Sequence, residues 1–111
     1  MLSVSKNGEI ELTRGDSACF TINISNGNGQ PYTVQEGDTL TLSLKKDTKD
    51  PKPCVQKSVE GINTFRFKPE DTSGLEFGNY YYDVEICTAA GDVYTVIEKT
   101  AFKIKEEVTT R

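Results

Sequence analysis

Apolar and polar residues alternate with a period of two along most of this chain. The clearest run covers Thr39–Lys45, where Leu40, Leu42 and Leu44 share one side and hydroxyl-bearing residues occupy most of the other. Strict alternation is typical of strands that bury one face and expose the other, which is common in antiparallel sheets. The pattern therefore predicts antiparallel strands around a common core.

Seven further runs alternate in the same way: Glu9–Thr13, Ser17–Ile24, Cys54–Val59, Asn63–Lys68, Asn79–Cys87, Asp92–Glu98 and Thr100–Lys105. Turn-forming Gly, Asn, Asp and Pro residues separate them at intervals typical of short strands. No stretch keeps a helical period. We predict an all-β fold of about seven to nine strands in two opposed sheets of about four strands.

One segment departs from the strand pattern. Pro69 pre-sets the first residue of a helix, Asp71 suits a first helical turn, and Gly74 can end it. We therefore predict one helical turn near Pro69–Leu75 that crosses from one sheet to the other. Leu75 is then expected to close the end of the core.

Two tyrosines, Tyr80 and Tyr82, follow this crossover on the face of the next apolar residues. In immunoglobulin-like sandwiches a short crossover precedes a tyrosine corner, whose ring packs inward and whose hydroxyl bonds to upstream backbone. Tyr80 or Tyr82 is the candidate, and Pro69, Asp71 and Leu75 complete the predicted structural corner. The segment favours an immunoglobulin-like antiparallel β-sandwich.

Several motifs resemble a known family: Gly15-Asp16, Gly29-Gln30-Pro31-Tyr32, Glu36-Gly37-Asp38, the block Pro69–Asp83 and a closing strand ending in Glu107-Val108-Thr109. Together they resemble the immunoglobulin-like N-terminal domain of the upper baseplate and tail proteins of phages of Gram-positive hosts. The resemblance spans about Glu9 to Thr109, and Pro69–Asp83 is its most specific part. It implies a phage or prophage structural protein of the tail, baseplate or neck, acting by protein–protein contact with other phage structural proteins or in a homo-oligomer.

Length and composition fit a single domain over residues 1–111, with a core at about 9–105 and flexible termini. The chain begins without an apolar signal core, so we expect synthesis in the bacterial cytoplasm without a signal peptide, and incorporation into the virion if phage-derived. No run approaches the length of a membrane span. We expect no membrane partner.

The charge balance argues against nucleic acid as a partner. The net charge is -4, and basic residues are interspersed with acidic ones. The one small basic cluster (Lys45, Lys46, Lys49 and Lys52) is interrupted by acids and fits a solvated loop. Nucleic-acid binders concentrate positive charge because phosphate contacts supply much of their affinity.

The chemistry of the chain argues against an enzyme. It has no histidine, which removes the usual general base and the commonest transition-metal ligand. Its carboxylates match no calcium-loop template, and no glycine-rich loop precedes a helix. We predict no catalytic residue, cofactor or metal. The tripeptide Arg14-Gly15-Asp16 also occurs in cell-adhesion motifs, but a simple turn is favoured.

The three cysteines are predicted to be reduced. Cys19 alternates with inward residues on its strand, and Cys87 does the same on its own strand. On opposed sheets these two side chains point away from each other, which forbids a disulfide between them.

The run 92–97 is apolar on both faces, with Tyr94 and Val96 opposite Val93, Thr95 and Ile97. One face of a strand covers the core, so the second apolar face is expected to meet something else. Tyr94 and Val96 are therefore the candidate interface, although neighbouring terminal segments of the chain could cover the same face.

The alternative function is a carbohydrate- or receptor-binding β-sandwich module. Such modules display aromatic rings on a concave face, and three tyrosines are candidates for outward rings here: Tyr32, Tyr81 and Tyr94.

Overall fold

A computed structural model describes residues 2–4, 8–25 and 28–108, and within them the chain forms ten strands and one short helix. The strands are β1 (Leu2–Val4), β2 (Ile10–Thr13), β3 (Ala18–Thr21), β4 (Ile24–Ser25), β5 (Pro31–Tyr32), β6 (Thr39–Lys45), β7 (Val55–Glu60), β8 (Thr64–Phe67), β9 (Gly78–Cys87) and β10 (Val93–Lys105); the helix α1 (Pro69–Ser73) joins β8 to β9. The expectation of a mostly β chain with one helical turn near 69–75 is confirmed.

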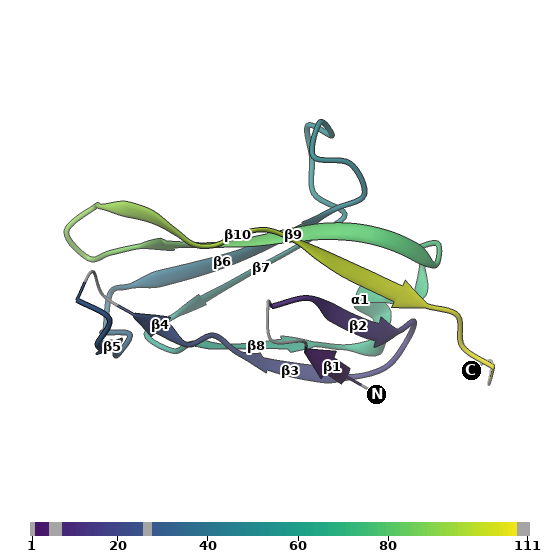
Figure 1. The fold of residues 1–111 in the computed structure, drawn as a ribbon, viewed down its shortest axis with the longest axis horizontal. Coiled ribbons are helices and arrows are strands. Elements are labelled where there is room, and N and C mark those ends of the chain that lie inside the picture. The colour runs from purple at the N-terminus through teal and green to yellow at the C-terminus, as the bar shows by residue number, and fades with distance from the viewer. Residues whose placement is uncertain (1, 5–7, 26–27, 109–111) are drawn as a thin grey trace.

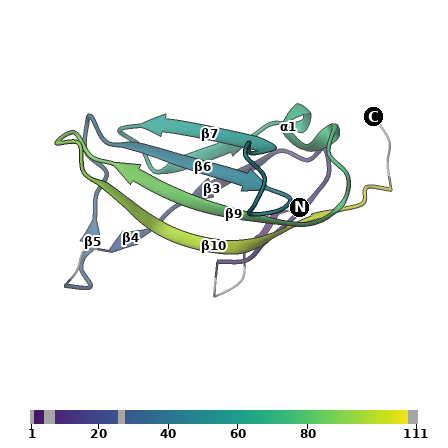
Figure 2. The same cartoon turned by 90° about the horizontal axis from the view of Figure 1, so that it is seen from above.

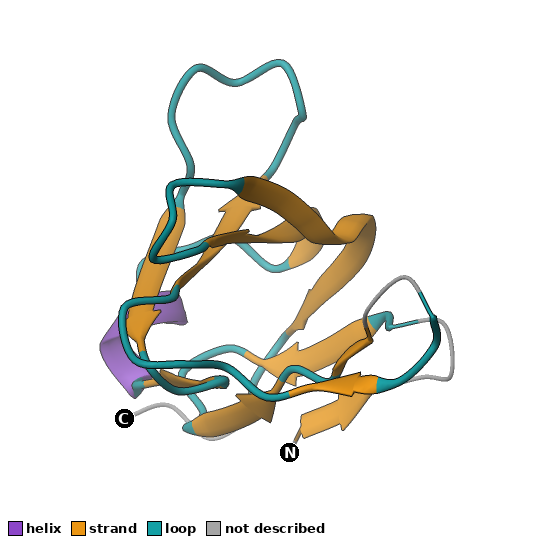
Figure 3. Ribbon diagram, turned by 90° about the vertical axis from the view of Figure 1, so that its left-hand side faces the viewer, coloured by secondary structure: helices purple, strands orange, loops and turns teal. Residues whose placement is uncertain are grey.

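Six strands form one sheet in the order β1-β2-β10-β9-β6-β7 (Figures 1 and 2). Neighbours in it run antiparallel, except that β2 runs parallel to β10. The sheet curls into a half-barrel, as Figure 3 shows. Two-stranded sheets, β3–β8 and β4–β5, complete the described part of the chain.

The expected division into two antiparallel sheets of about four strands is therefore wrong. Alternation tells which face of a strand is buried, but it does not tell which strand lies beside it. The run expected at Ser17–Ile24 illustrates this limit, because it splits into two strands with different partners. β3 pairs with β8, and β4 pairs with β5. At the break, the Ile22 amide donates to the carbonyl of Asn63, and the Asn63 side chain donates back to the Ile22 carbonyl.

The two runs predicted at 92–98 and 100–105 form one long strand, β10. Its pairing with β9 shifts register between Thr95 and Ile97, and again between Ile97 and Thr100. Such irregularities add residues to one strand and re-aim its side chains. The sequence pattern did not reveal them because a bulge interrupts the alternation from which the strand is inferred.

Aromatic rings fill the centre of the core between the curled sheet and the β3–β8 pair. Phe20 meets Phe67 edge-on at 5.1 Å between ring centroids, and Phe67 stacks on Phe102 at 5.8 Å. Tyr82 meets Phe102 edge-on at 5.9 Å. Aromatic pairs in these geometries contribute about 0.5–1.5 kcal/mol beyond their buried area. This cluster ties β3, β8, β9 and β10 together.

Cys19, Cys54 and Cys87 are all exposed. The outward register expected for Cys19 and Cys87 is therefore confirmed, because Cys19 lies between buried Ala18 and Phe20, and Cys87 follows buried Ile86. The core was expected at about 9–105 with flexible termini outside it, but Leu2–Val4 form β1, which pairs with β2 in the large sheet. Residues 1, 5–7 and 109–111 lie outside the described residues. In the described ranges, no helix has the length and apolarity needed to cross a membrane.

Candidate functional site

The helical crossover is fixed to the sheet through Asp71. Its carboxylate accepts a hydrogen bond from the Lys68 amide at 2.7 Å and lies 2.7 Å from the Lys57 ammonium on β7. Burial by itself raises the pKa of Asp71, but the bonds from Lys57 and Lys68 outweigh it and hold that pKa below its ordinary value. Pro69, at the first helical position, is exposed. Asp71 thus joins α1 to the edge strand β7.

A second set of contacts ties the crossover to the β2–β3 turn. The Gly15 amide donates to the buried hydroxyl of Thr72 at 2.8 Å. Arg14 donates to the carbonyl of Leu75 at 3.1 Å and to the carboxylate of Glu107 at 2.7 Å. The tripeptide that begins at Arg14 is a turn, as favoured, in which the Asp16 amide bonds to the Thr13 carbonyl. Its arginine is engaged within the chain.

Tyr80 and Tyr82 lie in the core, with 2% and 3% of their surface exposed. The Tyr80 hydroxyl donates to the carbonyl of Glu76, four residues upstream, at 2.7 Å. The Tyr82 hydroxyl donates to the carbonyl of Gly8. Burial raises the pKa of both phenols. Leu75 is half-buried and packs against the same core. We call this region, defined by α1 and by Arg14, Leu75 and Tyr80, the crossover end of the molecule.

β4, β5 and the β9–β10 hairpin lie at the opposite end of the molecule (Figure 1). Apolar side chains are exposed in this region. Val93 is 55% exposed, Tyr94 58% and Ile62 54%. Val96 is half-buried and packs against the core together with Ile97, because the register shift after Thr95 turns both inward. The exposed apolar residues of the hairpin are therefore Val93 and Tyr94, rather than the expected pair Tyr94 and Val96.

Two hollows continue this apolar surface on either side of the β4–β5 pair. One has a volume of about 550 Å³, and Tyr94 and Val96 line it together with Ile24 and Tyr32. The other has a volume of about 660 Å³ and is lined by Ile62 as well as by Ile24 and Tyr32. We call this region, defined by the six apolar residues Ile24, Tyr32, Ile62, Val93, Tyr94 and Val96, the apolar end.

A buried carboxylate organises the backbone beneath the apolar end. Asp38 is 2% exposed and accepts hydrogen bonds from the Tyr32 hydroxyl and from the amides of Gln35 and Ala89. The bond from Tyr32, followed by the bond from Gln35, holds the pKa of Asp38 below its ordinary value. Asp38 thereby connects β5, the start of β6 and the β9–β10 turn.

The sequence does not identify Asp38 as a buried residue, because Glu36-Gly37-Asp38 has the composition of a turn. Gly37 has φ +92°, and a Cβ at this position would lie 2.9 Å from the Cβ of Ala89. A short acidic side chain directly after a turn glycine and at the start of an alternating run is the available sequence signal. That signal is weak, since such residues are also common in exposed turns.

The structure does not gather the remaining candidate groups, namely acidic and cysteine side chains and tyrosine rings, into one site. Among the described residues, no group of three or more cysteine or acidic side chains is placed to hold a metal ion. Of the three tyrosines considered for outward rings, Tyr94 is exposed, whereas Tyr32 and Tyr81 are half-buried. No protein-family model matches the chain, and a search of curated proteins finds no significant match. The apolar end is therefore assessed on its geometry alone.

Proposed function

We propose that this chain is an immunoglobulin-like structural module of a phage or prophage tail, baseplate or neck, and that it acts by protein–protein assembly through its apolar end. The observation that carries the assembly role is the exposure of Val93, Tyr94 and Ile62 on one end of the molecule. Tyr94 and Ile62 line two hollows that share Ile24 and Tyr32. Apolar surface that continues over several residues in this way is characteristic of protein contact sites. The expected occupant is another structural protein of the same particle.

The strand order supports the immunoglobulin-like part of the proposal. The order β10-β9-β6-β7 corresponds to the G-F-C-C′ sheet of a variable-type domain, and β3–β8 corresponds to strands B and E on the opposite side. α1 then occupies the E–F crossover, and Tyr80 stands near the start of strand F with its hydroxyl bonded upstream. The phage assignment is supported by the sequence motifs described above.

A non-catalytic role is consistent with the side chains available. The chain has no histidine. The lowered pKa values of Asp38 and Asp71 are accounted for by partners within the fold. Perturbed carboxylates of this kind occur in structural networks as well as in active sites. We propose no catalytic residue and no cofactor.

The assembly role can be tested by size-exclusion chromatography with light scattering, together with incorporation into assembled particles. Tyr94→Lys and Val93→Lys place charge on exposed positions and should prevent assembly while the chain stays folded. Val96→Lys is less informative because Val96 packs against the core. Phe77→Lys, at a position that is 52% exposed at the crossover end, serves as the control. If the Tyr94 and Val93 variants fold and still enter the particle normally, the apolar end is not the contact surface.

A further inference from the structure

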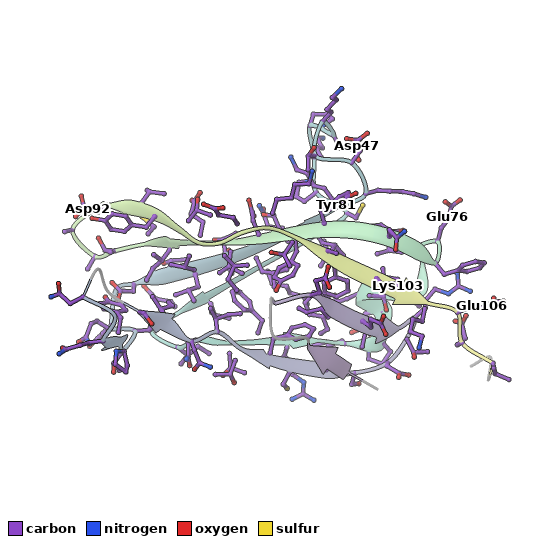
Figure 4. All side chains as sticks on the ribbon, viewed as in Figure 1. Asp47, Glu76, Tyr81, Asp92, Lys103 and Glu106 are labelled. Atoms are coloured by element: carbon purple, nitrogen blue, oxygen red, sulfur yellow. The ribbon has the colours of Figure 1, made fainter. Side chains whose placement is uncertain are left out.

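The outer face of the curled sheet carries a third hollow, separate from the two at the apolar end. It has a volume of about 610 Å³, and β6, β7, β9 and β10 contribute its lining. Residues of the loop between β6 and β7, including Pro51 and Pro53, form one wall. Figure 4 shows Asp47 in this loop, which rises above the sheet, and Tyr81 on the sheet beneath it. We call this hollow the polar trough.

The floor of the polar trough is lined with short hydrogen-bonding side chains. Thr41 pairs across the sheet with Ser58 on β7, and the two hydroxyl oxygens lie 3.0 Å apart. Ser43 pairs with Gln56, whose side-chain amide donates to the Ser43 hydroxyl at 3.0 Å. Hydroxyl and amide groups can both donate and accept hydrogen bonds. The floor therefore suits a ligand that also carries both kinds of group.

On β9, two carboxylates lie beside the paired polar residues of β6 and β7. Asp83 pairs with Ser43, and Glu85 pairs with Thr41. Both side chains are exposed, and neither carboxylate makes a side-chain hydrogen bond or an ion pair with the other described residues. Their oxygens are available as strong acceptors for hydroxyl groups of a ligand.

An aromatic ring and a cation lie on the lining of the trough. The Lys99 ammonium lies 4.6 Å from the centre of the Tyr81 ring. Lys99 lies within the register shift between Ile97 and Thr100, where the strand irregularity re-aims side chains. An exposed cation–π contact of this kind is weak, so a ligand can displace the ammonium from the ring or hydrogen-bond to it.

The charges of the trough narrow the class of ligand. The ammonium groups of Lys45 and Lys99 balance the carboxylates of Asp83 and Glu85. The Lys45 ammonium is also engaged, since it donates to the Asp50 carbonyl at 2.8 Å. The exposed carboxylates of Asp83 and Glu85 would repel an anionic ligand, and an apolar ligand would remove the polar groups of the floor from water without offering hydrogen bonds.

We propose that the polar trough binds a neutral oligosaccharide. The C–H face of a sugar ring can pack on Tyr81, while its hydroxyl groups bond to Asp83, Glu85 and the hydroxyl and amide groups of the floor. This role goes beyond assembly and does not depend on it, because Tyr94 and the rest of the apolar end do not line the trough.

The test is a titration of the full chain with cellohexaose, maltohexaose and chitohexaose, followed by backbone amide chemical shifts and by calorimetry. At least one probe should shift amides at Ser43, Gln56 and Tyr81 and leave those around Tyr94 unchanged. Tyr81→Ala should weaken that binding by about tenfold or more, and Asp83→Asn by a smaller factor. Tyr94→Ala is the matched aromatic control and should bind normally.

Asp83→Asn keeps the proposal testable if Tyr81→Ala fails to fold, because Asp83 is exposed. Absence of binding by all three neutral probes overturns the proposal. So does binding that survives both Tyr81→Ala and Asp83→Asn. A preference for an oligogalacturonate that is lost in Lys99→Ala would show that the trough selects an anion and would also overturn it. None of these results bears on assembly through Tyr94.

Discussion

The two ends of this molecule differ in how completely the chain covers its own apolar core. At the crossover end, α1 seals the core, Tyr80 is buried, and Arg14 bonds to both Leu75 and Glu107. At the apolar end, Asp38 orders the backbone, but Val93 and Tyr94 remain more than half exposed. The ends lie at opposite extremes of the long axis (Figure 1).

Under the proposed assembly role, the chain itself completes the crossover end, whereas a partner would complete the apolar end. In the described residues, no buried side-chain nitrogen or oxygen lacks a hydrogen-bond partner, so the polar groups at both ends are internally satisfied. The contrast is therefore confined to apolar surface. Substitutions at the crossover end should change stability, and substitutions of exposed residues at the apolar end should change association.

The largest effect is expected for Tyr80→Ala. Truncation of a fully buried aromatic side chain should lower the free energy of unfolding by about 3–5 kcal/mol. Tyr80→Phe, which keeps the ring and loses only the bond to Glu76, should lower it by about 1 kcal/mol. Chemical denaturation of both variants measures these changes. Tyr94→Ala is the control at the other end and should change stability by less than about 0.5 kcal/mol; equal losses for Tyr80→Ala and Tyr94→Ala would remove the distinction between the ends.

A smaller loss is expected for Gly37→Ala beneath the apolar end. The left-handed backbone at φ +92° costs a residue with a Cβ about 1–2 kcal/mol, and the added carbon would also lie 2.9 Å from the Ala89 Cβ. Gly29→Ala is a matched control, since Gly29 has φ +78° and no atom within 4 Å of the added carbon. Thermal unfolding should show a greater loss for Gly37→Ala. The difference should shrink when Ala89→Gly is added, and a difference that Ala89→Gly leaves intact would contradict the close approach.

The pH dependence of stability should report on Asp38. Its pKa is lower in the folded chain than in the unfolded chain, chiefly because of the bond from Tyr32. The resulting stabilisation is present above the unfolded carboxyl pKa of about 4 and is lost as the pH falls through the lower folded value. Urea unfolding at several acidic pH values should show a shallower decline for Asp38→Asn than for the unaltered chain. Identical slopes would show that the carboxylate is not held by Tyr32, Gln35 and Ala89.

The smallest effect on the fold is expected from the cysteines. All three are exposed, so a thiol reagent should titrate three thiols without denaturant and leave the melting temperature nearly unchanged. Cys87 pairs with Val93 across the hairpin and so reports on the apolar end, whereas Cys54 lies beside Leu44. A disulfide between Cys19 and Cys87 would mean that the strand register is wrong by one residue.

The sequence predicted local features of the fold and left its long-range pairings open. Alternation placed β6 and its inward leucines correctly, and Pro69 with the acids after it located α1. The parallel pairing of β2 with β10 and the bond from Arg14 to Glu107 join segments about ninety residues apart. No local pattern encodes such partners. The alternation predicts an exposed ring at Tyr94, which the structure confirms. The bulge that turns Val96 inward and the burial of Asp38 depend on tertiary contacts.

If the proposed assembly role is right, only the apolar end becomes covered when this chain assembles. Hydroxyl-radical footprinting tests it directly by comparing Tyr94 with Phe77, which are 58% and 52% exposed at opposite ends. In the isolated chain both rings should be oxidised at rates consistent with exposed residues. In the assembled state we expect strong protection of Tyr94, together with Val93, and little change at Phe77. Protection of Phe77 alone, or no protection of Tyr94 in a verified assembly, would contradict it.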